Sequence, residues 1–117
     1  MNGVLILAHG SREKQTEATF NKIVEMAKVK VDVLVETAFM EFSEKNIEAG
    51  LNALLAKGVT RIKVVPYFLF SGIHIKQDIP EEIAAFQNNH PGLTIEMGAT
   101  LGEDQRLAEI LADRIVG

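Results

Sequence analysis

Runs of apolar residues alternate with stretches of mixed apolar and polar positions, and this pattern predicts strands and helices in turn. Residues 4–7 are all apolar, which is typical of a strand buried on both faces. Residues 13–28 follow with apolar positions near helical spacing, and they predict an amphipathic helix. We expect Ser11 to cap the N-terminus of that helix.

Three further segments, 31–39, 61–65 and 93–97, also predict strands, and a helical pattern follows each one. Four strand–helix units in series imply a parallel sheet with helices on both faces. The crossover connections should be right-handed. We therefore predict an α/β domain with a flavodoxin-like, four-stranded parallel sheet in the order 2-1-3-4.

Side-chain signals set the expected bounds of the three later helices. The first opens at Ser43 and stops at Gly58, a residue typical of helix ends. The second starts where Asp78 and Glu81 form a capping-box pattern. The third begins at Asp104 and carries four apolar residues at helical spacing, namely Leu107, Ile110, Leu111 and Ile115.

Length and composition narrow the class of protein. The chain has 117 residues, which suits a single domain, and its 24% of charged residues is ordinary for a globular protein. It has no cysteine, which excludes disulfides and thiolate metal sites and is compatible with a reducing cytosol. A net charge of −4 without a basic tract argues against a nucleic-acid partner. The first apolar run is too short for a membrane span and lacks the basic leader of a signal peptide, so we expect a cytoplasmic protein.

Candidate chemistry gathers at one edge of the predicted sheet. Ligands of open α/β sheets bind beyond the carboxyl ends of the strands, here between strands 1 and 3. His9 and Glu41 follow the first two strands, and His74 lies in the loop after the third. Imidazole and carboxylate suit divalent first-row metals, and imidazole also transfers protons near neutral pH. Taken alone, Glu41 would be a solvated strand end, but between Met40 and Phe42 and next to His9 a functional role explains it equally well. His90 fits a structural role in a turn.

The loop after the third strand is unusually apolar for a segment expected at the surface. Residues 67–70 are all aromatic or aliphatic. Either they pack against the following helix, or a partner chain or a flat apolar ligand covers them. Arg12, Lys14 and Lys76 lie near the two histidines in sequence. Such scattered basic residues usually form a solvated face, but here they would make a positive rim suited to carboxylates.

Four segments together resemble the short CbiX-type chelatases. They are LILAHGSR, ETAFMEFSEKNI, VVPYFLFSGIHIKQDIPEEI and GATLGEDQRLAEIL. The pairing of A-H-G-S-R with S-G-x-H-x-x-x-D-I-P is the most specific part of the likeness, which covers nearly the whole chain. This family comprises small type II tetrapyrrole metal chelatases that insert cobalt, or in methanogen relatives nickel, into sirohydrochlorin. Residues 98–102 depart from the family, whose members carry a proline-containing stretch there.

The resemblance implies that residues 1–117 form one chelatase half-domain that dimerises, because longer relatives carry two halves around a cleft. It places metal-binding and catalytic histidines at His9 and His74, with Glu41 as a third catalytic residue that balances charge or orients an imidazole. The histidines would replace water on the metal and accept protons from the macrocycle. Substrate-binding residues would be Ser11, Arg12, Tyr67, Phe68, Leu69, Ser71, Gly72 and Lys76. The partners implied are a sirohydrochlorin-type tetrapyrrole and its metal, Co²⁺ or Ni²⁺, with no further cofactor.

Three alternatives stay open. A phosphate-transfer enzyme could use His9 as nucleophile, although histidine phosphatases have arginine before the histidine and this chain has Ala8. A receiver-type binding module would need an acidic pocket that the ends of strands 1 and 3 do not supply. A metal or tetrapyrrole carrier without catalysis cannot be separated from a chelatase by sequence. The ligand set also permits cobalt, nickel or iron.

Overall fold

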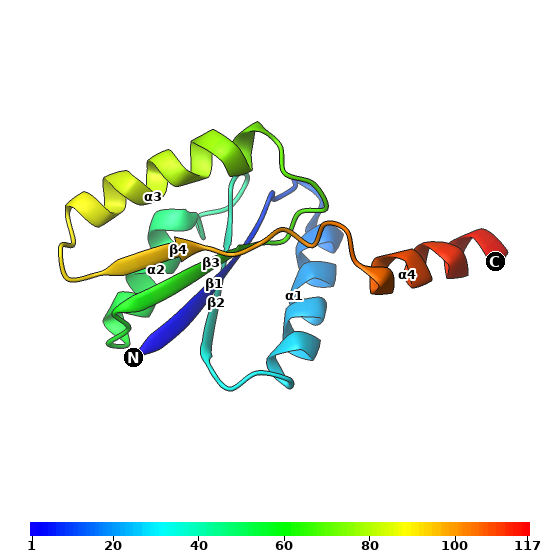
Figure 1. The fold of residues 1–117 in the computed structure, drawn as a ribbon, viewed down its shortest axis with the longest axis horizontal. Coiled ribbons are helices and arrows are strands. Elements are labelled where there is room, and N and C mark those ends of the chain that lie inside the picture. Colours follow the sequence, from blue (N-terminus) through cyan, green and yellow to red (C-terminus); the bar gives the residue numbers. More distant parts are fainter.

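In the computed structural model, which describes residues 1–117, strands and helices alternate along the whole chain (Figure 1). The elements are β1 (Asn2–Ala8), α1 (Lys14–Lys28), β2 (Leu34–Phe39), α2 (Ile47–Ala56), β3 (Arg61–Pro66), η1 (His74–Asp78), α3 (Ile79–Asn88), β4 (Thr94–Met97) and α4 (Gln105–Val116). Each predicted strand and helix is present. The second strand is shorter than expected and begins at Leu34 rather than at residue 31.

The four strands form one parallel sheet in the predicted order β2-β1-β3-β4. Alternate residues of the strands point to opposite faces, and α2 and α3 cover one face while α1 covers the other (Figure 1). The main core lies under α2 and α3, and its fully buried members include Leu5, Leu7, Leu51, Leu54, Ile62 and Val64. A smaller cluster under α1 contains Ala8, Phe20, Val24 and Phe39. These two layers fix the carboxyl ends of β1, β2 and β3 at one edge.

Two predicted serine caps are wrong. The Ser11 hydroxyl accepts a hydrogen bond from the backbone N–H of Glu13, and α1 begins only after Glu13. The Ser43 hydroxyl likewise accepts from the N–H of Lys45, while Asn46 is the residue that caps α2. Neither serine directly precedes its helix, so each of these hydrogen bonds closes a local turn in the loop instead of capping the helix. Both turns lie in loops at the carboxyl edge of the sheet.

The capping box predicted at Asp78 is also wrong. Asp78 has helical dihedral angles and makes no capping hydrogen bond, because a π-helical turn, η1, precedes α3 and already contains it. Its side chain instead contacts His74. The predicted cap of α4 is confirmed, since Asp104 Oδ1 accepts a hydrogen bond from the N–H of Arg106.

Helix α4 projects away from the sheet and buries none of its residues (Figure 1). Its apolar side chains are therefore open to solvent, with Ile110, Leu111 and Ile115 exposed by 49%, 62% and 76%. None of the helices combines the length and apolar character that a membrane crossing requires.

Candidate functional site

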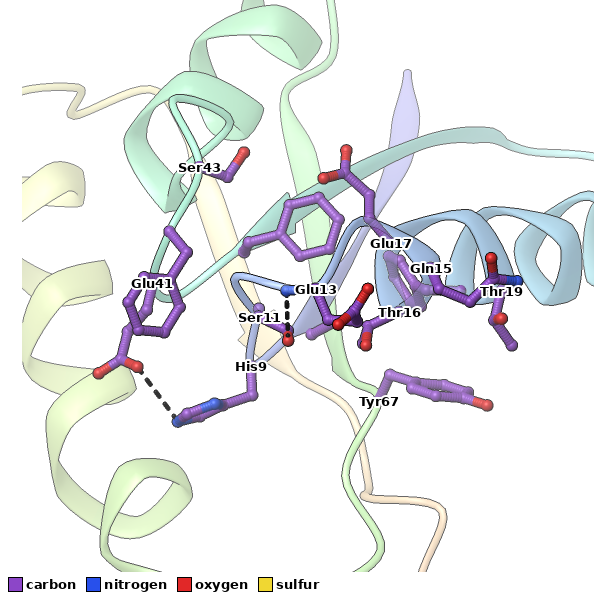
Figure 2. Close-up of a pocket in the computed structure, with 15 residues that line it drawn as sticks. His9, Ser11, Glu13, Gln15, Thr16, Glu17, Thr19, Glu41, Ser43 and Tyr67 are labelled. Carbon is purple, nitrogen blue, oxygen red and sulfur yellow. Dashed lines mark hydrogen bonds and ion pairs between the residues drawn. The ribbon is translucent and has the colours of Figure 1, made fainter.

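His9 and Glu41 lie side by side because the pairing of β1 with β2 continues past both strand ends. The N–H of Met40 donates to the carbonyl of Ala8, and the N–H of Glu41 donates to the carbonyl of His9, each at 3.0 Å. The two side chains turn toward one another, with His9 Nε2 and Glu41 Oε2 3.8 Å apart (Figure 2). This separation is too long for a hydrogen bond. Both side chains are about half exposed, at 53% and 50%, so an incoming ion can reach them.

Gly10 allows this close approach of the two loops. Its φ of +96° lies in the region that residues with a side chain rarely adopt. A Cβ built on Gly10 would collide with the carbonyl oxygen of Glu41. Glycine at this position therefore sets the distance between the His9 and Glu41 backbones.

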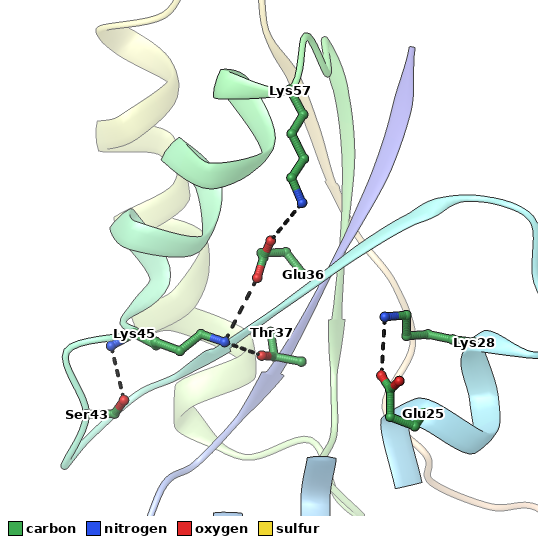
Figure 3. A network of polar contacts seen from close by, with 7 residues as sticks. All are labelled: Glu25, Lys28, Glu36, Thr37, Ser43, Lys45 and Lys57. Carbon is green, nitrogen blue, oxygen red and sulfur yellow. Dashed lines mark hydrogen bonds and ion pairs between the residues drawn. The ribbon is translucent and has the colours of Figure 1, made fainter. Parts of the chain in front are cut away.

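Polar contacts of α2 and of its preceding loop hold the segment that carries Glu41 (Figure 3). The backbone carbonyl of Lys45 accepts a hydrogen bond from the N–H of Phe39 at 2.7 Å. The side-chain ammonium of Lys45 donates to the Thr37 hydroxyl at 2.9 Å. Lys45 and Lys57 also both reach the carboxylate of Glu36 on β2, at 3.9 and 3.4 Å. Exposed ion pairs of this kind stabilise little individually, so we assign them to fixing the loop geometry.

His74 opens η1, which returns the loop after β3 to the same edge of the sheet. The rings of His9 and His74 have centroids 5.8 Å apart and are tilted by 56°. Imidazole nitrogens bind zinc at about 2.0–2.1 Å. Two rings at this separation can therefore share one first-row metal ion between them.

The Nδ1 atom of His74 lies 2.9 Å from Oδ2 of Asp78, four residues later in the chain. Sequence analysis missed this contact, because Asp78 was assigned to a helix cap. The signal that could have found it is the i,i+4 spacing of His74 and Asp78 on a helix. No three histidine or carboxylate side chains converge closely enough to form a complete metal cage. The donors are a histidine pair with one carboxylate beside each ring.

A cavity of about 490 Å³ opens beside His9, between the start of α1 and the loop after β2 (Figure 2). Ser11 and Tyr67, both predicted to bind substrate, line it. The ring of Tyr67 packs against Phe20 of α1, with centroids 5.3 Å apart. Glu13 and Glu17 also line this cavity, so its α1 side is acidic.

The apolar loop after β3 divides into two parts. Phe68 packs against the main core and lies 6.4 Å from the His9 ring, between ring centroids. Leu69 and Phe70 are instead exposed by 49% and 80%, as is Ile73 by 61%. Packing therefore accounts for the first half of the loop, and the second half is left as an apolar surface beside the histidines.

The remaining predicted substrate-binding residues lie on the exposed loops around this edge. Ser71, Gly72 and Lys76 are exposed on the segment that leads into and forms η1. The guanidinium of Arg12 sits 4.9 Å from the centroid of the Phe42 ring, a cation–π distance. Phe42 has a positive φ of 60° and is 54% exposed, and sequence reasoning assigned it no role. Nothing in its residue type signals that backbone conformation.

Comparison with known proteins places this geometry in context. The CbiX family model matches residues 3–117. A protein of Priestia megaterium named sirohydrochlorin ferrochelatase is 37% identical over 116 residues, which cover 98% of this chain and 44% of that protein. A protein of Sulfurisphaera tokodaii named sirohydrochlorin cobaltochelatase is 34% identical over 115 residues, 98% of this chain and 92% of that protein.

Two solved structures of sirohydrochlorin chelatases are also similar to this chain. The sirohydrochlorin chelatase SirB from Bacillus subtilis subspecies spizizenii, in complex with cobalt, superposes with a TM-score of 0.91 at 34% identity over 97% of this chain and 49% of that one. SirB from Bacillus subtilis with Fe³⁺ gives a TM-score of 0.89 at 33% identity, over 97% and 45% of the two chains. The chain thus spans about half the length of several relatives it matches and nearly the whole length of others.

Proposed function

The chain belongs to the CbiX family, and from this premise we propose that it inserts a divalent metal ion into sirohydrochlorin. The observation that carries the proposal is the pair of imidazole rings, His9 and His74, 5.8 Å apart at the carboxyl edge of the sheet. Relatives named for cobalt and for iron both match, so these two metals are the first candidates. Nickel as the metal, the cobalamin pathway and a cytoplasmic location stay predictions.

In the proposed mechanism the histidines take the metal from water and keep it only loosely. Two nitrogen ligands leave most coordination positions of the ion to water or to an incoming tetrapyrrole nitrogen. The site is half open to solvent, so the ion can enter hydrated and lose water stepwise. A closed cage of protein ligands would hold the ion too firmly to release it into the macrocycle.

Insertion also requires a base, because two N–H protons leave the macrocycle as the metal enters. We assign one proton to the Glu41 carboxylate and the other to the His9 nitrogen, which becomes free to accept it once the metal has passed to the macrocycle. The Glu41 carboxylate is exposed and lies 3.8 Å from His9 Nε2, close enough for its charge to balance that of the bound ion. The negative charge of Glu41 also favours a cation near the two rings.

The peripheral carboxylates of the tetrapyrrole need cationic or N–H partners, which the exposed loops supply. Arg12 and Lys76 flank the histidines from the β1–α1 loop and from η1. The backbone amides near Ser11, Ser71 and Gly72 add donors, while Tyr67, Phe68 and Leu69 offer apolar contact to the ring. Glu13 and Glu17 in the α1 cavity disfavour a substrate carboxylate beside them, so we place the carboxylates on the side of η1 and only ring contacts toward Tyr67.

We further propose that the half-domain works as a homodimer, with the second copy closing a cleft over the histidines. Two apolar surfaces support this: Leu69, Phe70 and Ile73 beside the site, and the unpacked face of α4. Sedimentation should show a dimer at micromolar concentration, and Phe70→Asp should shift it to monomer. A fully active monomer would contradict the dimer proposal.

The function is tested by supplying sirohydrochlorin with Co²⁺, Fe²⁺ or Ni²⁺ and following its absorption spectrum. We expect many turnovers per protein with at least one of these metals, above the rate without protein. One equivalent of bound metal or tetrapyrrole without turnover would identify a carrier instead.

A further inference from the structure

The proposed metallation mechanism gives no role to the hydrogen bond between His74 and Asp78. We propose that Asp78 is a positioning residue, which holds the proton of His74 on Nδ1 and so presents Nε2 to the metal. This inference rests on the proposed function, because it assigns His74 to metal binding. Asp78 itself touches neither the metal nor the tetrapyrrole in this scheme.

The tautomer follows from the donors and acceptors available. An ionised carboxylate only accepts hydrogen bonds, so the 2.9 Å contact requires that Nδ1 of His74 carries the proton. A neutral imidazole has a single N–H, and Nε2 is then left with its lone pair. Carboxylate–histidine pairs of this kind orient a metal-binding ring and raise the basicity of the free nitrogen.

The backbone fixes Asp78 where this contact needs it. The next residue, Ile79, is fully buried in the main core, and its N–H donates to the carbonyl of His74 across the π-helical turn. Single π-helical turns of this kind are frequent at functional sites. The carbonyl of His74 is thus bonded to a core residue, and its ring is bonded to Asp78 directly before that residue, although both side chains are partly exposed.

A helix-capping role does not explain the side chain. Asp78 has αR dihedral angles and no capping hydrogen bond, and Glu81 does not complete a capping box with it. His90 provides an internal reference, because its Nδ1 lies 2.9 Å from the carbonyl of Phe86 and must also carry the proton. The two histidines therefore share a tautomer, but only the tautomer of His74 depends on Asp78.

The test compares Asp78→Ala and Asp78→Asn with Glu81→Ala, a nearby exposed carboxylate that contacts no histidine. Two-bond ¹⁵N–¹H NMR spectra of the metal-free protein report the tautomer of each histidine, and Co²⁺ titration reports affinity. In Asp78→Ala we expect His74 to populate both tautomers, His90 to be unchanged, and Co²⁺ affinity to fall about 10–100-fold. Asp78→Asn removes the negative charge, and its amide can donate to Nδ1, so this variant should also populate the Nε2–H tautomer and bind Co²⁺ more weakly than the parent.

An unchanged His74 tautomer or unchanged Co²⁺ affinity in Asp78→Ala would overturn the inference. His74→Ala separates this failure from that of the proposed function. If His74→Ala abolishes Co²⁺ binding and chelation while Asp78→Ala changes neither, only the role of Asp78 is wrong. If His74→Ala also binds and inserts metal normally, the proposed site itself is wrong.

Discussion

Replacing Gly10 with alanine should damage the site and the fold together, because Gly10 meets two constraints at once. Its φ of +96° excludes most side chains, and a Cβ would strike the carbonyl oxygen of Glu41. To relieve the collision, the β1–α1 loop must move away from the β2–α2 loop. That movement breaks the hydrogen bond from the N–H of Glu41 to the carbonyl of His9 and separates the two side chains.

The expected destabilisation can be assembled from its parts. A left-handed conformation costs a residue with a Cβ about 1–2 kcal/mol, and the lost hydrogen bond adds about 0.5–1.5 kcal/mol. Gly10→Ala should therefore lower the free energy of unfolding by about 1.5–3.5 kcal/mol. For a domain of this size, the melting temperature should fall by about 6–14 °C.

Two matched variants separate the contributions. Gly58 has a φ of +87° but nothing within 4 Å of a built Cβ, so Gly58→Ala carries only the backbone strain. Gly92 has neither a positive φ nor a neighbour, so Gly92→Ala should change stability by less than about 0.5 kcal/mol. Thermal and urea unfolding measure all three, and chelation is assayed below the melting temperature. If Gly10→Ala is no less stable than Gly58→Ala, or keeps full chelation, the close loop contact does not shape the site.

Three further predictions concern single residues. Glu41→Gln should leave the circular dichroism spectrum unchanged and slow metallation about 10–100-fold. An unchanged rate between pH 6 and 8 would show that Glu41 is a solvated strand end with no role in metallation. Phe20→Ala should lower the free energy of unfolding by about 3–5 kcal/mol, because Phe20 is 4% exposed and packs against Phe39 and Tyr67. The side-chain hydrogen bond from Arg106 holds the pKa of Asp104 well below its usual value of 3.8, so this cap stabilises α4 above that value and is lost as the pH falls through the lowered pKa. Far-UV circular dichroism should show this loss of α4 at low pH in the parent chain, and no such step in Asp104→Ala.

The sheet could be predicted from the sequence because each strand is a short segment rich in apolar and β-branched residues, and a helical pattern follows each one. Parallel order then brings the carboxyl ends of neighbouring strands together, and this is why His9 and Glu41, distant in sequence, meet as expected. The predicted proximity of His74 to His9 is also present, at 5.8 Å between ring centroids. The meeting of His9 and Glu41 depends on topology, which hydrophobic pattern largely determines, whereas the position of His74 also depends on η1.

The features that were missed depend on local backbone geometry or on packing partners. Serine bonds equally well to a turn or to a helix N-terminus, so residue type alone could not place the starts of α1 and α2. The π-helical turn that converts Asp78 from a cap into a partner of His74 has no hydrophobic signature. The apolar stripe of α4 predicted a helix, but periodicity does not specify which surface that stripe packs against.

The central claim is that His9 and His74 together form the metallation site. It is tested most directly by measuring sirohydrochlorin metallation in His9→Ala, His74→Ala and His90→Ala, with circular dichroism and melting temperature recorded for each. His90, stacked on Phe86 on the far end of α3, is the control of identical chemistry. The account predicts strong loss of metallation in the first two variants, with the fold intact, and a near-normal rate in the third. Full rates in His9→Ala and His74→Ala, or losses explained by unfolding alone, would contradict it.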